Sequence, residues 1–371
     1  MNNERGALHG MRVFDLSDSI AGQFCGRMLC DFGAEVTLVE PPGGSATRRQ
    51  GPFRDTQGSE SLVFFHNNTG KSSVTLDPST AAGHALLAAL LRGADVVIAE
   101  PGMDLRWLRD GNPGCVIATV SGFGDDGPYR GWQGTEMIYQ ALAGIMRHNG
   151  EAGREPLYGC GDRASYGAGV AAYISILAAL YARPRIHGGQ DVAIDVAETT
   201  AAMANPFVTQ FLYNGIEEPR GRSMPFARLA CRNGWVGIYL HVHLWQALCE
   251  ALDLAELASD PRFAAAKARL DNWKALEALL QAHVAEWSTA DLLARVQARK
   301  IVAAPAHSLE ELRRANPHLD ARDYWDSVET PAGQRPILGP QFRMSVTPRQ
   351  VRAGPPALGE SNARLFQARG V

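Results

Sequence analysis

Short apolar runs alternate with amphipathic stretches along the first third of the chain. Strand-like runs cover residues 11–16, 34–40, 72–77, 94–100 and 115–122, and helical periodicity covers 21–32 and 79–92. The two helical stretches stop at Gly33 and Gly93, and glycine commonly follows the last residue of a helix. Strands that alternate with helices of this length favour βαβ units, which build a parallel sheet with right-handed crossovers.

The pattern changes character after Gly215. Before it, helices are predicted over 134–148, 164–183 and 197–213, and a strand over 188–196. Residues 217–235 are basic, contain two prolines and show no period, which is typical of a linker or crossing segment. Short amphipathic helices then continue to about Asp320, with strand-like runs at 235–242 and 301–308, and the tail after Thr330 is rich in proline and glycine.

These patterns predict an α/β protein with two domains. A Rossmann-like parallel-sheet large domain is expected from residues 1–214 together with 325–371. A smaller α+β domain is expected from 215–324. A length of 371 residues is enough for two domains of roughly 150 residues each.

Composition narrows the classes of function. A net charge of -3 argues against a general nucleic-acid-binding protein, which would carry a basic face. The six cysteines are scattered and form no CxxC pair, which favours reduced thiols and a cytoplasmic location. The N-terminus has no apolar core typical of a signal peptide. The most apolar run, 166–182, is shorter than the roughly 20 residues of a membrane span, so a buried helix is expected there and no membrane contact.

Two motifs offer weak chemical signals. His241 and His243 would share one face of a strand, but no nearby Cys, Asp or Glu completes a metal site, which favours ordinary surface or core histidines. Lys71 lies in a GKS sequence that lacks the first glycine of a phosphate-binding P-loop. A solvated loop lysine is the favoured interpretation, and contact with a phosphate is the alternative.

Asp162 precedes the apolar helical stretch and is the only carboxylate between Glu155 and Asp191. An aspartate there can cap the helix by accepting backbone N–H bonds, which contributes roughly 0.5–2 kcal/mol. The helix dipole would also favour its ionised form. An ionised carboxylate with small neighbours such as Gly161 and Ala164 is equally a possible nucleophile. Capping is the favoured interpretation on these grounds alone.

Several strings taken together resemble the class III CoA-transferase family, which includes formyl-CoA transferase and alpha-methylacyl-CoA racemase. They begin with MRVFDLSDSIAGQFCGRMLCDFGAEVTLVEPPGG and continue through NNTGKSSVTLD, GADVVIAE, NPGCVIATVSGFGDDGPY and GDRASYGAG to TPRQVRAGPPALGESN. They occur in order from about Gly10 to the end of the chain. The resemblance implies a ring-like protomer that interlocks with a second copy in a homodimer.

By position, Asp162 matches the catalytic aspartate of that family. The resemblance implies CoA transfer from an acyl-CoA to a carboxylic acid through an aspartyl anhydride and an aspartyl-CoA thioester. Coenzyme A is then a substrate, and no tightly bound cofactor or metal is expected. The surrounding motifs make the nucleophile the favoured interpretation, and a helix N-terminus can serve both roles.

The resemblance also implies a set of residues near the CoA. Arg106 is the expected phosphate-binding arginine, with Arg109 as the alternative. The remaining positions are Ile20, Ala21, Lys71, Leu76, Asp77, Glu100, Pro101, Gly102, Gln133, Gly134, Thr135 and Glu136.

Three departures from the family pattern keep other functions open. Thr135 stands where the racemases carry a histidine base, which favours transfer over racemisation, and sequence does not bring His148 near Asp162. Glu100 and a shortened loop differ from the relatives at the CoA site. Residues 215–235 lack the glycine run of formyl-CoA transferase, which argues against a formyl/oxalate substrate pair. A CoA-binding protein without catalysis is the third interpretation.

Overall fold

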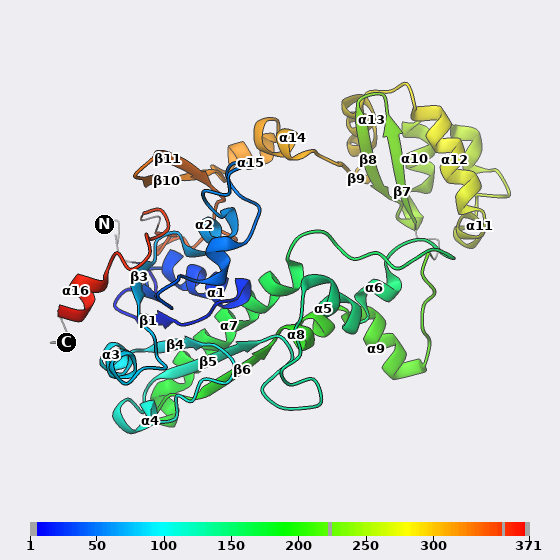
Figure 1. Cartoon of the computed structure of the whole chain (residues 1–371). Coiled ribbons are helices and arrows are strands. Elements are labelled where there is room, and N and C mark those ends of the chain that lie inside the picture. The colour runs from blue at the N-terminus through cyan, green and yellow to red at the C-terminus, as the bar shows by residue number, and fades with distance from the viewer. Residues whose placement is uncertain (1–5, 222–224, 351–352, 368–371) are drawn as a thin grey trace. The chain divides into compact units, whose positions relative to one another are not determined.

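The computed structural model describes residues 6–221, 225–350 and 353–367. They form two compact units, one containing the chain up to Arg220 and from Asp323 onward, the other Gly221–Arg322. The sequence placed these boundaries at 214/215 and 324/325, so the two divisions differ by at most six residues. Figure 1 shows the elements of both units.

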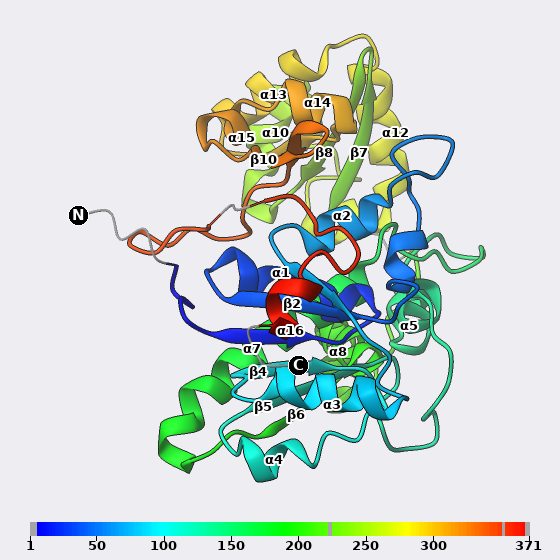
Figure 2. The same cartoon turned by 60° about the vertical axis from the view of Figure 1, so that its left-hand side comes forward.

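The large unit is built on a six-stranded parallel sheet with the strand order β3-β2-β1-β4-β5-β6. The strands are β1 (Arg12–Asp15), β2 (Glu35–Glu40), β3 (Ser72–Thr75), β4 (Val96–Ala99), β5 (Val116–Ser121) and β6 (Asp191–Asp195). Figure 2 shows β4, β5 and β6 side by side. This order is that of doubly wound dinucleotide-binding folds, so the predicted Rossmann-like sheet is confirmed.

Helices cover both faces of the sheet. They are α1 (Ile20–Asp31), η1 (Ala46–Arg49), α2 (Leu62–Asn68), α3 (Ala81–Leu91), α4 (Leu108–Gly111), α5 (Glu136–Leu142), α6 (Ile145–His148), α7 (Arg163–Ile186), α8 (Val196–Met203), α9 (Asn205–Asn214) and α16 (Asn362–Gln367). Successive strand side chains point to opposite faces. Val96 thus packs in the core with α1 and α7, and Val97 packs in the core with α3 and α4. Figure 1 shows the C-terminal helix α16 beside β3.

Helices α1 and α7 approach each other at backbone distance. A Cβ atom added to Gly169 of α7 would lie 2.7 Å from the carbonyl oxygen of Ala21 in α1 and 3.0 Å from the Phe24 ring. Ala164, Ala168 and other small residues continue this buried face of α7. The Gly- and Ala-rich run therefore packs closely against α1, as expected, but only part of the predicted buried helix is buried.

Helix α7 is longer than the sequence indicated. It has 24 residues and is apolar enough to cross a membrane by length and composition, so the length argument made from the 17-residue run was wrong. The helix starts before the apolar run and continues through Pro184 in its last turn. One face lies in the core of the large unit, whereas Ile174 and Tyr181 on the other face are 59% and 77% exposed.

Two long predicted helices are interrupted. The stretch 134–148 divides into α5 and α6 at Gly144, whose φ of 79° lies in the left-handed region. The stretch 197–213 divides into α8 and α9 at Ala204, directly before a helix with proline in its first turn. Because proline lacks an N–H and restricts the preceding residue, it favours a new helix start there.

The small unit is a three-stranded antiparallel sheet with helices packed on one face. The strands are β7 (Phe226–Cys231), β8 (Gly234–Tyr239) and β9 (Val302–Pro305), in the order β7-β8-β9. The helices are η2 (Val242–Leu244), α10 (Trp245–Ala251), η3 (Ala255–Ala258), α11 (Ala266–Asp271), α12 (Trp273–Val284), α13 (Thr289–Ala298), α14 (Leu309–Arg314) and α15 (Pro317–Ala321). Of these, α14 and α15 bury no residue and contribute none to the core of this unit.

Strand β7 lies inside the segment predicted to be an irregular linker. Only Ala227 and Leu229 on it are fully buried, so its apolar alternation is too short to stand out in sequence. The hairpin β10 (Asp326–Thr330) and β11 (Gly333–Ile337) in the tail was also missed. Residues 222–224 of the predicted linker, and Val351 and Arg352 of the tail motif, lie outside the described residues.

Lys71 forms a buried ion pair with Asp15, the last residue of β1. Its Nζ donates to Asp15 Oδ2 at 2.8 Å, the Gln23 carbonyl at 2.7 Å and Asn68 Oδ1 at 2.9 Å. Neither charged side chain is exposed. The ion pair connects β1 to the loop before β3, and the expectation of a solvated loop lysine was wrong.

We predict that Lys71→Met lowers the free energy of unfolding by about 3–5 kcal/mol, because it leaves the Asp15 carboxylate buried without its partner. Urea denaturation followed by circular dichroism measures the loss. Lys267→Met is the matched control, since Lys267 forms an exposed ion pair with Asp271 and should change stability by about 0.5 kcal/mol or less. The double variant Asp15→Leu/Lys71→Met should recover most of the loss, and an equal loss in the double variant would contradict the explanation.

Candidate active site

The strand order reverses direction between β1 and β4, where ligands bind in doubly wound sheets. Asp15 is the last residue of β1, and its Oδ1 accepts hydrogen bonds from the N–H and Oγ of Ser17, two residues later. Asp18 follows and donates its backbone N–H to the Glu100 carboxylate at the end of β4. A second contact joins Asp18 Oδ1 to the Ala46 N–H at 2.5 Å.

Two carboxylates at this edge are harder to ionise than usual. Burial raises the pKa of Glu100 to about 7, and the negative charges of Asp18 and Asp15 act in the same direction. Burial also raises the pKa of Asp18, although the Ala46 N–H bond and the positive charge of Arg49 oppose it. Glu100 is thus poised to exchange a proton near neutral pH.

Several residues expected near CoA have side chains in the interior. Ile20 and Ala21 form the buried first turn of α1, and Leu76 lies in the core beyond β3. The Lys71 ammonium donates three hydrogen bonds to buried acceptors, which argues against direct contact with a phosphate. Asp77 is exposed, and its Oδ1 accepts hydrogen bonds from the Ser79 N–H and hydroxyl.

The structure brings other expected residues together in one pocket of about 590 Å³. Pro101, Gly102, Arg106 and Arg109 line it, joined by Arg130 from the loop after β5. Arg106 pairs with Asp104 through two hydrogen bonds at 2.9 and 2.7 Å, in a fully exposed position. Arg109 binds Asp191 and the Cys115 carbonyl. The carboxylates of Asp104, Asp125 and Asp191 line the same pocket, so an anionic ligand would have to compete with Asp104 and Asp191 for two of the three guanidinium groups.

Asp162 stands at the N-terminus of α7 without capping it through its side chain. Its backbone angles, φ -89° and ψ 55°, differ from the extended conformation of a capping residue such as Ser19, with φ -112° and ψ 153°. In that extended conformation a side chain can reach the N–H groups of the first turn. The capping interpretation of the Asp162 side chain was therefore wrong.

Glu136 supplies the missing cap from another helix. Its Oε1 accepts the Ala164 N–H at 2.7 Å and its Oε2 the Ser165 N–H at 3.4 Å. The Gln140 amide donates to the same Oε1 at 2.7 Å. Gln140 also exchanges hydrogen bonds with Gly159, donating to its carbonyl at 3.2 Å and accepting its N–H at 2.8 Å. Helix α5 thus fixes the loop that carries Asp162.

The three residues before Glu136 surround the start of α5. Gln133 and Thr135 are exposed, and Thr135 precedes α5 without a side-chain cap. Gly134 has the Tyr139 ring against it, since an added Cβ would lie 2.3 Å from a ring carbon. The strip expected from sequence therefore lies together, within one turn of the residue that caps α7.

Partial burial raises the pKa of Asp162, and the negative charge of Glu136 raises it further. The sequence predicted the opposite sign from a capping bond and the helix dipole. The difference follows from the hydrogen bonds, because the first-turn N–H groups that would stabilise an Asp162 carboxylate go to Glu136.

An aromatic cluster closes the other side of this helix start. The Tyr166 ring meets the Phe24 ring edge-on, with centroids 4.8 Å apart, and the His66 ring at 5.9 Å. Burial lowers the pKa of His66 to about 4, so its imidazole is neutral. Burial and the Asp162 charge raise the pKa of the Tyr166 phenol, which therefore keeps its proton.

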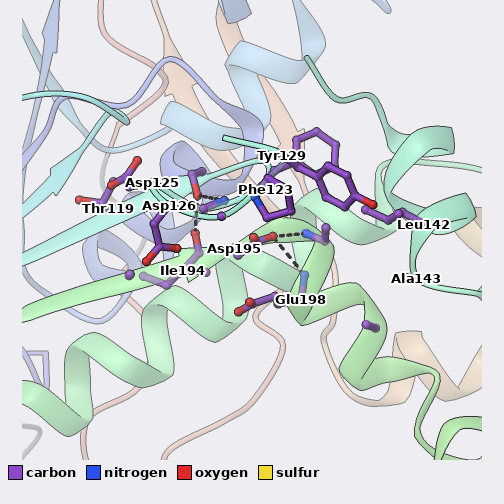
Figure 3. Close-up of a pocket in the computed structure, with 17 residues that line it drawn as sticks. Thr119, Phe123, Asp125, Asp126, Tyr129, Leu142, Ala143, Ile194, Asp195 and Glu198 are labelled. Carbon is purple, nitrogen blue, oxygen red and sulfur yellow. Dashed lines mark hydrogen bonds between the residues drawn. The ribbon is translucent and has the colours of Figure 1, made fainter. Parts of the chain in front are cut away.

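A second pocket, of about 540 Å³, opens beside β5 and β6 (Figure 3). Its lining combines Phe123 and Tyr129 with the carboxylates of Asp125, Asp126, Asp195 and Glu198. Asp195 accepts hydrogen bonds from two N–H groups at the start of α8, as the dashed lines in Figure 3 show.

Comparison with known proteins gives a consistent result. The family model "CoA-transferase family III" matches residues 8–362. The chain is 30% identical to the succinate–glutarate CoA-transferase of Agrobacterium fabrum, over 99% of this chain and 96% of that protein. It is 32% identical to the succinyl-CoA–D-citramalate CoA-transferase of Chloroflexus aurantiacus, over 97% and 93%.

A solved structure has the same fold. The crystal structure of a CAIB/BAIF family protein from Brucella suis superposes with a TM-score of 0.88 at 30% identity, covering 98% of this chain and all of that chain. The chain belongs to CoA-transferase family III. The resemblance seen in its sequence motifs is thereby confirmed, and the protein is an enzyme of this family.

The histidines of this CoA-transferase lie in varied settings. His241 and His243 are exposed, with ring centroids 5.5 Å apart, and they lead into α10. In the described ranges, no group of three or more His, Cys, Asp or Glu side chains is arranged to hold a metal. His148 stacks on Phe207 of α9, with ring centroids 4.2 Å apart.

Sequence reasoning missed two features of the candidate site in this family III enzyme. Arg130 was not singled out, although it follows the glycine-rich loop after β5 and could have been noticed as a cation near a strand end. The capping role of Glu136 had no local signal, because it lies 28 residues before the amide that it binds.

We predict that Glu100 makes stability fall as pH rises from 4.5 to about 7. In this window the unfolded chain has released the Glu100 proton and the folded chain still holds it, so raising the pH favours unfolding. Urea midpoints measured across this range should decline less in Glu100→Gln than in the unsubstituted enzyme. Glu310→Gln, at an exposed site paired with Arg314, should keep the original slope. Equal slopes in Glu100→Gln and the unsubstituted enzyme would contradict the assignment.

Proposed function

We propose that this enzyme transfers CoA from an acyl-CoA to a carboxylic acid by covalent catalysis at Asp162. The observation that carries the proposal is the free carboxylate at the N-terminus of α7. Among the described residues, no helix N–H is bound to the Asp162 side chain, which is half-buried and has a raised pKa. A more basic carboxylate without hydrogen bonds is the better nucleophile.

The proposed reaction balances without any redox step. An Asp162 oxygen attacks the thioester carbonyl, the C–S bond breaks, and a mixed anhydride and CoA thiolate form. The thiolate then attacks the aspartyl carbonyl, which gives an aspartyl-CoA thioester and releases the donor acid. The acceptor carboxylate attacks this thioester to form a second anhydride and free thiolate. The thiolate finally attacks the acceptor carbonyl, which yields the new acyl-CoA and restores Asp162.

The pocket with three arginines supports a site for the phosphates of CoA. Arg106, Arg109 and Arg130 line it together with the expected residues Pro101 and Gly102. Guanidinium groups bind phosphate oxygens through paired N–H donors. The pocket extends from the loop after β4 along Ile117 and Thr119 of β5 to Asp191 at the start of β6.

The names of the relatives support a carboxylic acid as acceptor. The Agrobacterium enzyme is named for succinate and glutarate, and a relative from Haloarcula marismortui that is 29% identical is named for succinyl-CoA and mesaconate. We therefore propose acyl-CoA and carboxylic acids as the two substrate classes. Succinyl-CoA with glutarate or mesaconate is the first pair to assay.

We predict that Asp162→Asn lowers kcat for CoA transfer by at least about 10³-fold, since the amide cannot form the anhydride. Hydroxylamine added during turnover should trap an adduct on the peptide containing Asp162, detected by mass spectrometry. Asp320→Asn, at an exposed site in the small unit, should keep full activity. Full transfer activity in Asp162→Asn would contradict the proposal, and so would α-deuterium exchange from heavy water without any transfer.

We also propose that a second copy of the chain covers the apolar side chains at the end of α9. Phe211, Leu212 and Tyr213 follow one another on this helix and are 55%, 76% and 87% exposed. Soluble proteins rarely leave such groups of large apolar side chains uncovered. The interlocked homodimer expected from the family resemblance would cover them.

Light scattering should give about twice the chain mass of 40.1 kDa. Because linked rings cannot separate without unfolding, tagged and untagged dimers should form no mixed dimers until they are denatured and refolded together. A monomer mass would contradict the dimer, and rapid subunit exchange would contradict interlocking.

A further inference from the structure

Helix α7 is capped in its first turn differently from several helices of the same unit. Helices α1, α2, α3 and α8 each use the residue at their own N-cap, and its side chain accepts a first-turn N–H. In α7 an aspartate occupies the N-cap position, but a glutamate from α5 accepts the first-turn N–H groups. Glu136 thus caps α7 in place of Asp162, although aspartate is a favoured N-cap residue.

The replacement is part of a connected set of hydrogen bonds. Glu136 Oε1 accepts both the Ala164 N–H and the Gln140 amide at 2.7 Å. Gln140 is 3% exposed, and its side-chain amide bonds both the carbonyl and the N–H of Gly159. The loop 159–162 is therefore fixed at Gly159 before Asp162 and at Ala164 after it. A side chain held at both ends of its loop is pre-organised, which reduces the cost of reaching a reactive geometry.

The groups around Asp162 leave its carboxylate without a cationic partner in the described part of the chain. The guanidinium of Arg163 donates instead to the Cys160 carbonyl at 3.1 Å. The Tyr166 phenol keeps its proton, and the neighbouring His66 is neutral. Among the residues that the structure describes, the charge that acts on the Asp162 carboxylate is that of Glu136, which has the same sign.

We propose that Glu136 is a positioning residue, which caps α7 in place of Asp162 and so keeps the Asp162 carboxylate free to react. The proposal rests on the function assigned to Asp162 above. It gives Glu136 a task different from the contact with CoA that its place in the sequence implied. Gln140 assists by holding the carboxylate of Glu136 and the backbone of Gly159 together.

Two substitutions separate the cap from the charge. Glu136→Gln keeps an oxygen that accepts the Ala164 N–H but removes the negative charge beside Asp162. Glu136→Ala removes both. Glu256→Gln, in η3 of the small unit, is the matched control for the loss of one exposed glutamate charge.

Hydrogen exchange at the Ala164 and Ser165 amides measures directly whether Glu136 caps α7. Glu136→Ala should exchange about fivefold faster at these two amides, which corresponds to about 1 kcal/mol for a lost helix cap. Glu136→Gln and Glu256→Gln should stay within about twofold of the unsubstituted enzyme. Unchanged exchange in Glu136→Ala would overturn the capping role.

Carbodiimide modification of Asp162, followed against pH by mass spectrometry, measures the effect of the Glu136 charge on Asp162. This measurement does not require enzymatic activity. The titration midpoint should move to lower pH in Glu136→Gln, because a like charge has been removed. It should not move in Glu256→Gln. An unchanged midpoint in Glu136→Gln would overturn the electrostatic part of the proposal.

Transfer kinetics distinguish positioning from substrate contact. Glu136→Ala should lower kcat about tenfold or more and leave KM for the acyl-CoA within about twofold. A raised KM with an unchanged kcat would overturn the proposal in favour of CoA contact. If the unsubstituted enzyme showed no transfer and no adduct, the function of Asp162 would fail, whereas the exchange and modification results would still decide the role of Glu136.

Discussion

The close backbone contact between α1 and α7 is the constraint on which the active site depends. Gly169 leaves only enough room for the Ala21 carbonyl and the Phe24 ring, so the two helices have a fixed separation. Helix α1 begins at the carboxyl end of β1, where the strand order of the sheet reverses. Fixing α7 against α1 therefore places Asp162 relative to the edge of the sheet where ligands bind in this fold.

The carboxylates of the large unit fall into two groups with different tasks. Glu40 is buried but bound by Arg48, Ser73 and Ser45, and these bonds outweigh burial so that its pKa is lowered. Burial raises the pKa values of Glu100 and Asp162, nearby like charges act in the same direction, and few hydrogen bonds oppose the shift. The first arrangement stabilises the fold, whereas the second is typical of reactive groups.

The sequence predicted what local patterns determine. The apolar runs of β1, β2, β4 and β5 are buried on both faces, and they are visible without any tertiary contact. The family motifs located Asp162 and the pocket residues from Pro101 to Arg109. Strand β7 and the hairpin of β10 and β11 were missed, because few of their residues are buried and each strand depends on pairing with another strand.

Predictions from sequence about the site were wrong where a residue distant in the chain sets the environment of the predicted group. An aspartate before a helix is normally its cap, and nothing next to Asp162 indicates otherwise. Asp162 is an exception because Glu136 of α5 accepts the hydrogen bonds of the first-turn N–H groups of α7. Lys71 is a similar case, since its partners Asp15 and Gln23 come from β1 and α1, and only the folded chain removes its charge from solvent.

The central claim is that an oxygen of Asp162 takes part in transfer. In the proposed reaction the acceptor carboxylate leaves one of its oxygens on Asp162 each time CoA passes to it. A single turnover with an ¹⁸O-labelled acceptor acid, followed by mass spectrometry of the peptide that contains Asp162, measures this directly. The account predicts one ¹⁸O atom in the Asp162 side chain, and an unlabelled Asp162 after complete turnover would contradict it.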